Sequence, residues 1–346
     1  MIFRAPEMLW NIDMVNEPVI RWLVGGPSRN GKTTLVRALD ESGALASLPV
    51  EALFTVYLDA RFSNPTAAVL DYLQRPRWTD PARTVAMTPA DCFIVPAETI
   101  ARNTASNTRP LQAIAGALDV MAQERGRPGW ITCDLLPETR WRELRREIPG
   151  LRLLVVLRDP RAACCASLYW RSYPERDPDA TTTLEFAAFQ WSLAARTAFG
   201  LQSQHPDEVE VVCFDDLIAR QPDTLRNIST LLRADSERLA AALPRQPWFS
   251  RIGDGFLTPD GSVAPLLSSQ ELNLIESIAW PWMARLNLSC SESRLPAPMR
   301  ARVLLVLAKV SPELARMLGQ WHYRPKLAMR GAINLVRNWI RRTFHI

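Results

Sequence analysis

The chain has 346 residues, of which 47% are hydrophobic and 22% are charged. These values are ordinary for a globular protein and exclude wholesale disorder, collagen and a simple coiled coil. Its longest apolar stretches are far shorter than the roughly 20 residues that a membrane-spanning helix needs. The N-terminal segment also lacks the basic and then apolar layout of a signal peptide, so we expect a cytoplasmic protein.

The basic residues of this chain are almost all arginine. The net charge is +5, and lysine occurs only at positions 32, 309 and 326. Arginine suits phosphate and sulfate, although biased genome composition would give the same excess. Six cysteines without a C-x-x-C pair and three histidines disfavour a disulfide framework, a zinc site or histidine-rich metal chemistry. We expect neither a metal nor a nucleic acid partner.

Short apolar segments alternate with amphipathic ones along most of the chain. Strands are predicted at residues 19–24, 130–133, 153–157 and 209–214. Helices are predicted from residue 33, over 138–147, from 160, and over 184–202, 222–232, 268–286, 298–318 and 326–344. This alternation predicts an α/β fold with a parallel sheet flanked by helices. Residues 61–110 are expected to form an irregular excursion with short helices around a binding cleft.

Residues 26–33 (GPSRNGKT) match the phosphate-loop pattern G-x-x-x-x-G-K-[ST] in full. They follow a predicted strand and open a predicted helix, which is the setting in which such a loop binds an anion. The alternative is a chance match in a glycine- and serine-containing loop. Alone, the pattern favours a nucleoside triphosphate. A GTPase is excluded because the lysine positions permit no N-K-x-D motif, and Asp134 is either a magnesium ligand or a helix cap.

A second candidate anion site follows the strand predicted at residues 153–157. Arg158 stands at its carboxyl end, where ligands bind in open α/β sheets, and Ser167 lies on the helix that follows. An arginine and a hydroxyl near one helix start can hold a phosphate. The alternative is a local ion pair between Arg158 and Asp159.

Together, these segments resemble the PAPS-dependent sulfotransferases, and the resemblance covers about residues 19–290. Beyond the loop and the R-D-P-R segment, it rests on residues 136–137, 148–150, 211–217 (VVCFDDL), 222–225 (PDTL) and 267–272. The chain departs from the family in several places. Ser28 separates Arg29 from Pro27, Asp134 replaces a lysine, and Ala166 rather than Ser167 stands eight residues after Arg158.

The resemblance implies that the chain transfers a sulfuryl group from PAPS to a hydroxyl of a glycan, lipid or natural product, without a metal, and releases adenosine 3′,5′-bisphosphate. It implies donor-binding residues Gly26, Ser28, Arg29, Asn30, Gly31, Lys32, Thr33, Thr34, Arg158, Ser167 and Arg251. Either Arg29 or Lys32 would contact the transferring group. The base would be Glu51, which best matches the position of a family glutamate, with Asp59 as runner-up.

The C-terminal segment is basic and helical in its pattern. Residues 314–346 contain seven Lys or Arg, and apolar residues recur at helical spacing over 326–344. This helix could rest on anionic lipid, pack on the domain, or form a basic wall for an anionic acceptor. We expect a sulfotransferase-like P-loop domain over 1–296 and a basic helical extension over 297–346.

Two other functions remain open at this point. One is an NTP-dependent small-molecule kinase that uses the same loop, which the intact Lys32-Thr33 pair favours. The other is a catalytically idle, membrane-associated protein that retains a nucleotide fold. The position of Arg158 favours the sulfotransferase.

Overall fold

A computed structural model describes residues 19–325 and 329, apart from 61, 63, 77, 80–85, 105–107, 169–179, 220, 246–266, 291–295 and 326–328. Arg251 and most of the predicted basic helix at 326–344 therefore lie outside the described residues.

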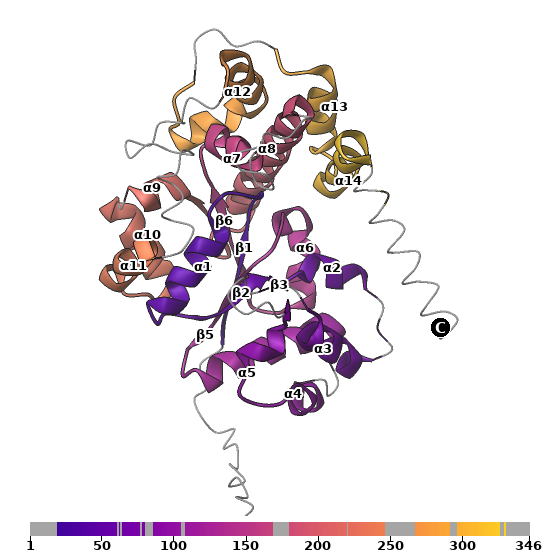
Figure 1. The fold of residues 1–346 in the computed structure, drawn as a ribbon, viewed down its shortest axis with the longest axis vertical. Helices are drawn as coiled ribbons and strands as arrows, with labels where there is room; N and C mark the ends of the chain where they lie inside the picture. The colour runs from indigo at the N-terminus through magenta and orange to yellow at the C-terminus, as the bar shows by residue number, and fades with distance from the viewer. Residues whose placement is uncertain are drawn as a thin grey trace, which may run out of the picture.

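The chain folds around a five-stranded parallel sheet in the order β2-β5-β1-β6-β7. Its strands are β1 (Ile20–Gly25), β2 (Ala46–Glu51), β5 (Gly129–Cys133), β6 (Leu151–Leu157) and β7 (Val209–Cys213). Figure 1 shows β1 at the centre, with helices on both faces. The predicted α/β class and parallel sheet are confirmed.

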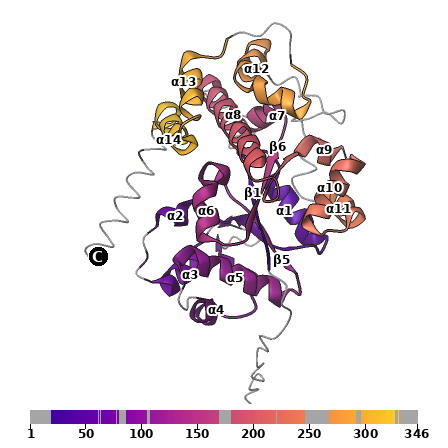
Figure 2. The ribbon, with the colours of Figure 1, turned by 180° about the vertical axis from the view of Figure 1, so that it is seen from behind.

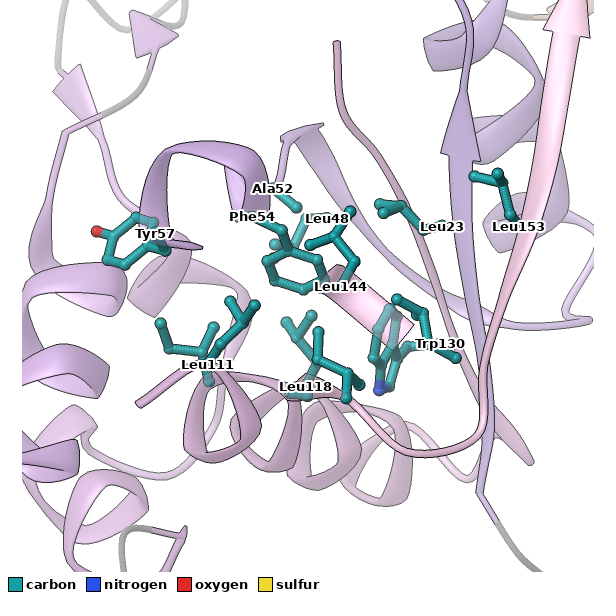
Figure 3. Close-up of a cluster of buried hydrophobic side chains, with 14 of the residues drawn as sticks. Leu23, Leu48, Ala52, Phe54, Tyr57, Leu111, Leu118, Trp130, Leu144 and Leu153 are labelled. Atoms are coloured by element: carbon teal, nitrogen blue, oxygen red, sulfur yellow. The ribbon is translucent and has the colours of Figure 1, made fainter. Parts of the chain in front are cut away.

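The two faces of the sheet are covered by different helices because side chains alternate along each strand. Trp22 and Val24 point to the face packed by α1 (Lys32–Glu41), α10 (Pro222–Leu232) and α11 (Ser236–Ala242). Leu23 and Trp130 point to the opposite face, where α3 (Pro65–Gln74), α5 (Pro110–Glu124), α6 (Trp141–Glu147) and α8 (Ala180–Gln204) pack. Figure 3 shows this second core around Trp130.

The remaining elements lie mostly beyond the ends of the sheet or at its rim. The helices are α2 (Phe54–Asp59), α4 (Ala97–Thr104), α7 (Pro160–Leu168), α9 (Phe214–Ile218), α12 (Ser269–Met283), α13 (Met299–Leu307) and α14 (Pro312–Tyr323). Two short strands, β3 (Trp78–Thr79) and β4 (Ala86–Met87), pair antiparallel, and the 3₁₀ turn η2 (Pro137–Arg140) follows β5.

Most predicted elements match, and two differences have clear causes. The single helix predicted over 298–318 is wrong, because α13 ends at Leu307 and α14 restarts with Pro312 at its first position. Strand β2 has no counterpart in the prediction, because Pro49 interrupts its apolar pattern. The proline is tolerated because β2 lies at the edge of the sheet.

The C-terminal helices α13 and α14 pack against α8, as Figure 2 shows from behind. Buried Glu185 of α8 accepts hydrogen bonds from Arg300 of α13 and from Tyr323 of α14. The predicted domain boundary after residue 296 stays a prediction. Among the described residues, no helix is both long and apolar enough to cross a membrane.

Candidate functional site

The loop between β1 and α1 has the backbone shape of an anion-binding turn. Gly26 (φ 109°) and Gly31 (φ 86°) lie in the left-handed region, and so does Arg29 (φ 67°). A Cβ atom at Gly26 would lie 2.4 Å from the carbonyl oxygen of Val156, and one at Gly31 would lie 2.4 Å from the ring of Phe214. Both positions therefore require glycine, and the chain can close tightly over the N-terminus of α1.

Lys32 holds the loop from within. Its side chain is buried, and Nζ donates hydrogen bonds to the carbonyl oxygens of Gly26 (2.8 Å) and Pro27 (2.7 Å). These bonds use two of the three N–H groups of the ammonium. The third N–H group has no partner among the described residues and is available for an anion. Lys32 therefore fixes the loop and also places a positive charge at its centre.

Asn30 joins this loop to strand β6. It is fully buried, and its Nδ2 donates to the carbonyl oxygen of Ser28 (2.8 Å). Its Oδ1 accepts a hydrogen bond from the backbone N–H of Arg158 (2.7 Å). The predicted loop and the predicted second anion site are therefore neighbours, and Asn30 acts on the protein backbone at both of them.

Arg158 is buried at the carboxyl end of β6, with 6% of its surface exposed. Its Nε lies 3.6 Å from Oδ1 of Asp215, and among the described residues neither Nε nor Nη2 has a hydrogen-bond partner. Burial lowers the pKa of this guanidinium, while the charge of Asp215 acts in the opposite direction. A buried arginine with unsatisfied donors fits an anion at this place.

Asp159, the alternative ion-pair partner of Arg158, pairs with Arg161 instead. The two charged groups are 2.6 Å apart, and Arg161 also reaches Glu276 of α12 at 3.1 Å. Asp215 is a site residue that the sequence did not predict, and it also accepts a hydrogen bond from the backbone N–H of Asp159 (2.6 Å). It lies in the segment 211–217, which carries part of the family resemblance but indicates no binding role for this aspartate.

Ser167 and the loop line one small pocket. Its lining includes Pro27, Ser28, Asn30, Ser167 and Trp191. The hydroxyl of Ser167 donates to the carbonyl oxygen of Ala163 (2.9 Å), one turn earlier in α7. With respect to the residues that the structure describes, both lone pairs of that hydroxyl oxygen remain available as acceptors, and the hydroxyl can rotate toward a ligand.

Glu51 is half-buried at the end of β2, in register with Cys133 of β5. Burial lowers the pKa of Arg29 to about 10, and the charge of Glu51 partly offsets this effect. The same charge contributes to the raised pKa of buried Asp134, which burial brings to about 6. Glu51, Arg29 and Asp134 therefore lie close enough to interact at the carboxyl edge of the sheet.

Asp59 and Asp134 are both engaged by protein groups. Asp59 is 55% exposed at the end of α2 and accepts a hydrogen bond from Nη1 of Arg140 (2.7 Å). Asp134 accepts from the backbone N–H of Thr55 (2.9 Å) and from that of Leu135 (2.7 Å). Asp134 thus caps a helix, as one of its two alternatives predicted, and the helix that it caps is α2.

Glu138 was missed by the sequence analysis and lies directly behind the loop. It is buried, and its Oε2 accepts a hydrogen bond from the backbone N–H of Gly26 (3.0 Å). Burial raises its pKa to about 7, although the positive charge of Lys32 acts against this shift. Its contact with Gly26 spans 112 residues, and no local sequence signal marks it.

The remaining predicted loop residues differ in exposure. Ser28 is exposed, and Thr33 is half-buried with its Oγ1 4.0 Å from Sγ of Cys133. Thr34 is buried in the first turn of α1. The structure thus brings together the loop, Arg158, Ser167 and Glu51, and sets Asp59 beside Arg140.

No protein-family model matches the chain, and no curated protein matches it. The chain is similar to the sulfotransferase domain of the Synechococcus PCC 7002 olefin synthase, with 14% identity and a TM-score of 0.46 over 82% of this chain and 99% of that domain. It is also similar to the sulfotransferase domain from the curacin biosynthetic pathway, with 12% identity and a TM-score of 0.45 over 80% of this chain and 100% of that domain. A sulfotransferase of Mycobacterium avium is similar with 17% identity and a TM-score of 0.41 over 79% of each chain.

Replacing Glu138 by Gln should change how stability depends on pH. Because the pKa of Glu138 in the folded chain is about 7 against an ordinary 4.5, the folded state holds a proton that the unfolded state releases. Stability should therefore fall as pH rises from about 4.5 to 7, and this carboxyl alone should account for roughly 3 kcal/mol of that fall. Denaturant unfolding at several pH values measures it.

The Glu138→Gln variant should show a shallower fall than the wild type over that window. Glu237→Gln, at an exposed acid of α11, is the matched control and should leave the slope unchanged. If the stability of the wild type and of Glu138→Gln fell equally steeply with pH, Glu138 would not have the raised pKa described above.

Proposed function

We propose that this protein is a sulfotransferase that moves a sulfuryl group from PAPS to a hydroxyl acceptor. The observation that carries the proposal is the buried guanidinium of Arg158, a residue whose backbone N–H is held beside the phosphate loop by Asn30. PAPS carries anionic groups at both its 5′ and its 3′ positions, so it needs two anion sites at a fixed spacing. A loop that opens a helix and an arginine at the next strand supply such a pair.

In the proposed complex, the loop and the N-terminus of α1 hold the 5′-phosphosulfate, and Arg158 with Ser167 holds the 3′-phosphate. Nε and Nη2 of Arg158 have no hydrogen-bond partner in the described part of the chain, so they offer donors that an anion would satisfy. Asp215 forms an ion pair with the guanidinium at 3.6 Å, a separation too long for a hydrogen bond, so the Nε donor stays open to an anion. Arg251, which lies outside the described residues, is a further proposed contact to the 3′-phosphate.

Transfer forms a bond between the acceptor oxygen and sulfur, while the bond from sulfur to the 5′-phosphate oxygen breaks. Glu51 takes the proton of the acceptor hydroxyl, and Lys32 and Arg29 stabilise the charge on the leaving oxygen. Lys32 is suited to this role because its two bonds to loop carbonyls fix the position of its ammonium. Sulfuryl carries less charge than phosphoryl, so these cations suffice without a metal ion.

Replacing Arg158 by Ala should weaken the binding of adenosine 3′,5′-bisphosphate by about 10- to 100-fold, since it removes charge-assisted hydrogen bonds. Calorimetric titration without magnesium measures this loss. Arg158→Lys should lose part of the affinity, because an ammonium keeps the positive charge but lacks the planar set of N–H donors of a guanidinium. Arg152→Ala is the control, because Arg152 is an exposed arginine of the same strand.

ATP with magnesium is titrated alongside. A preference for ATP with magnesium that does not depend on Arg158 would contradict the proposal and would favour the NTP-dependent kinase instead. Thermal unfolding of each variant shows whether a loss of binding comes from a loss of folding.

Replacing Glu51 by Gln should leave bisphosphate binding intact and lower sulfuryl transfer by about 10²- to 10⁴-fold, because general-base catalysis is lost. The measurement uses PAPS labelled in its sulfuryl group and a panel of glycan, lipid and natural-product hydroxyls. Asp59→Asn distinguishes the two candidate bases. Loss of transfer in Asp59→Asn with full activity in Glu51→Gln would assign the base to Asp59 and contradict this prediction.

A further inference from the structure

Exposed apolar side chains gather on the C-terminal helices. Most of the large exposed hydrophobic residues in the described part of the chain lie between residues 299 and 329. Those of α13, the turn after it and α14 are Met299, Val303, Val306, Val310, Leu314, Met317, Leu318 and Trp321. We call this set the apolar stripe. Their spacing of three and four residues places them on one face of each helix.

The opposite face of each helix is already used for packing. Ala301 and Leu304 of α13 and Ala315 and Tyr323 of α14 are buried against α8 and its neighbours. The hydrogen bonds of Glu185 fix the same inner face. The apolar stripe therefore points away from the core of the domain, and Figures 1 and 2 show both helices at the rim of the molecule.

The charge near the stripe is mostly positive. Arg302 and Lys309 are exposed and lie on α13 and the turn that follows it. Glu313 is the only acid of residues 296–346, against ten Lys or Arg. Its carboxylate is held by Arg316 at 2.5 Å and also receives a hydrogen bond from Thr139 of η2 (3.4 Å). An apolar helix face with cations and a neutralised acid is the composition of a segment that lies on an anionic lipid surface.

We propose that the apolar stripe of α13 and α14 docks this protein onto an anionic membrane surface. The valines, methionines and Trp321 enter the boundary between headgroups and acyl chains, while Arg302 and Lys309 meet lipid phosphates. This surface consists of described residues and is distinct from the predicted helix at 326–344. It is independent of the sulfuryl transfer proposed above, since none of its residues belongs to the anion sites.

The position of α14 gives the docking a consequence for the site. Its first turn contacts η2 through the Glu313–Thr139 hydrogen bond, and η2 carries Glu138, which supports the loop. A membrane held by the apolar stripe would therefore lie on the other side of α14 from η2, with that helix between the lipid and the segment that supports the loop.

Co-sedimentation of the full chain with vesicles tests the proposal. Vesicles of phosphatidylcholine with phosphatidylglycerol should bind the protein at least about tenfold more strongly than vesicles of phosphatidylcholine alone, and added salt should weaken the binding. The triple variant Met299→Gln, Val306→Gln and Val310→Gln should lose at least about tenfold in binding. These positions are 70%, 59% and 88% exposed, so the variant should fold.

Ile94→Gln is the matched control, because Ile94 is an equally exposed apolar residue (81%) far from the stripe in sequence. It should bind vesicles as the wild type does. Absence of binding to the anionic vesicles, or binding that the triple variant retains, would overturn the proposal. So would a dimer in sedimentation velocity that the triple variant dissociates while no vesicle binding is seen, since the stripe would then face a second copy of the chain. Calorimetry with adenosine 3′,5′-bisphosphate on the same variants reads the anion sites separately.

Discussion

The pairing of β1 with β6, closed by the side chain of Asn30, is the constraint on which the candidate site depends. The parallel register places Gly25 beside Val155, so the loop after β1 and the turn after β6 begin at the same edge of the sheet. Asn30 then bonds to the loop through Nδ2 and to the backbone of Arg158 through Oδ1. Because Asn30 is fully buried, neither bond competes with water. The spacing between the two candidate anion-binding elements is therefore built into the fold.

Charged groups are buried at this edge at a cost to stability. Four charged side chains are buried here: Lys32, Glu138, Asp134 and Arg158. Burial raises the pKa of Glu138 and Asp134 and lowers that of Arg158, and each shift favours the neutral form of the group. Lys32 and Asp134 each have protein hydrogen bonds that offset the cost. Within the described residues, Nε of Arg158 approaches Asp215 at 3.6 Å but makes no hydrogen bond. A bound anion would supply a partner for the buried guanidinium of Arg158. An anionic ligand would therefore gain binding free energy here that a neutral ligand would not.

The sequence predicted those parts of the site that depend on local order. The strand, loop and helix around residues 20–41 and the turn at Arg158 follow from glycine positions, apolar runs and a proline at a helix start. The partners of these segments could not be predicted in the same way. Glu138 meets Gly26 across 112 residues, and Asn30 meets Arg158 across 128. Such contacts depend on strand order and register, which periodicity does not encode. The break before Pro312 was visible in the sequence, and a proline rule applied there would have found it.

The central claim is that one nucleotide bridges the loop and Arg158. A crystal structure of the protein with adenosine 3′,5′-bisphosphate tests it most directly. The account predicts the 5′-phosphate against the backbone N–H groups at the start of α1 and the 3′-phosphate within hydrogen-bond distance of Nε or Nη2 of Arg158. A nucleotide bound elsewhere, or one whose 3′-phosphate points away from Arg158, would contradict it.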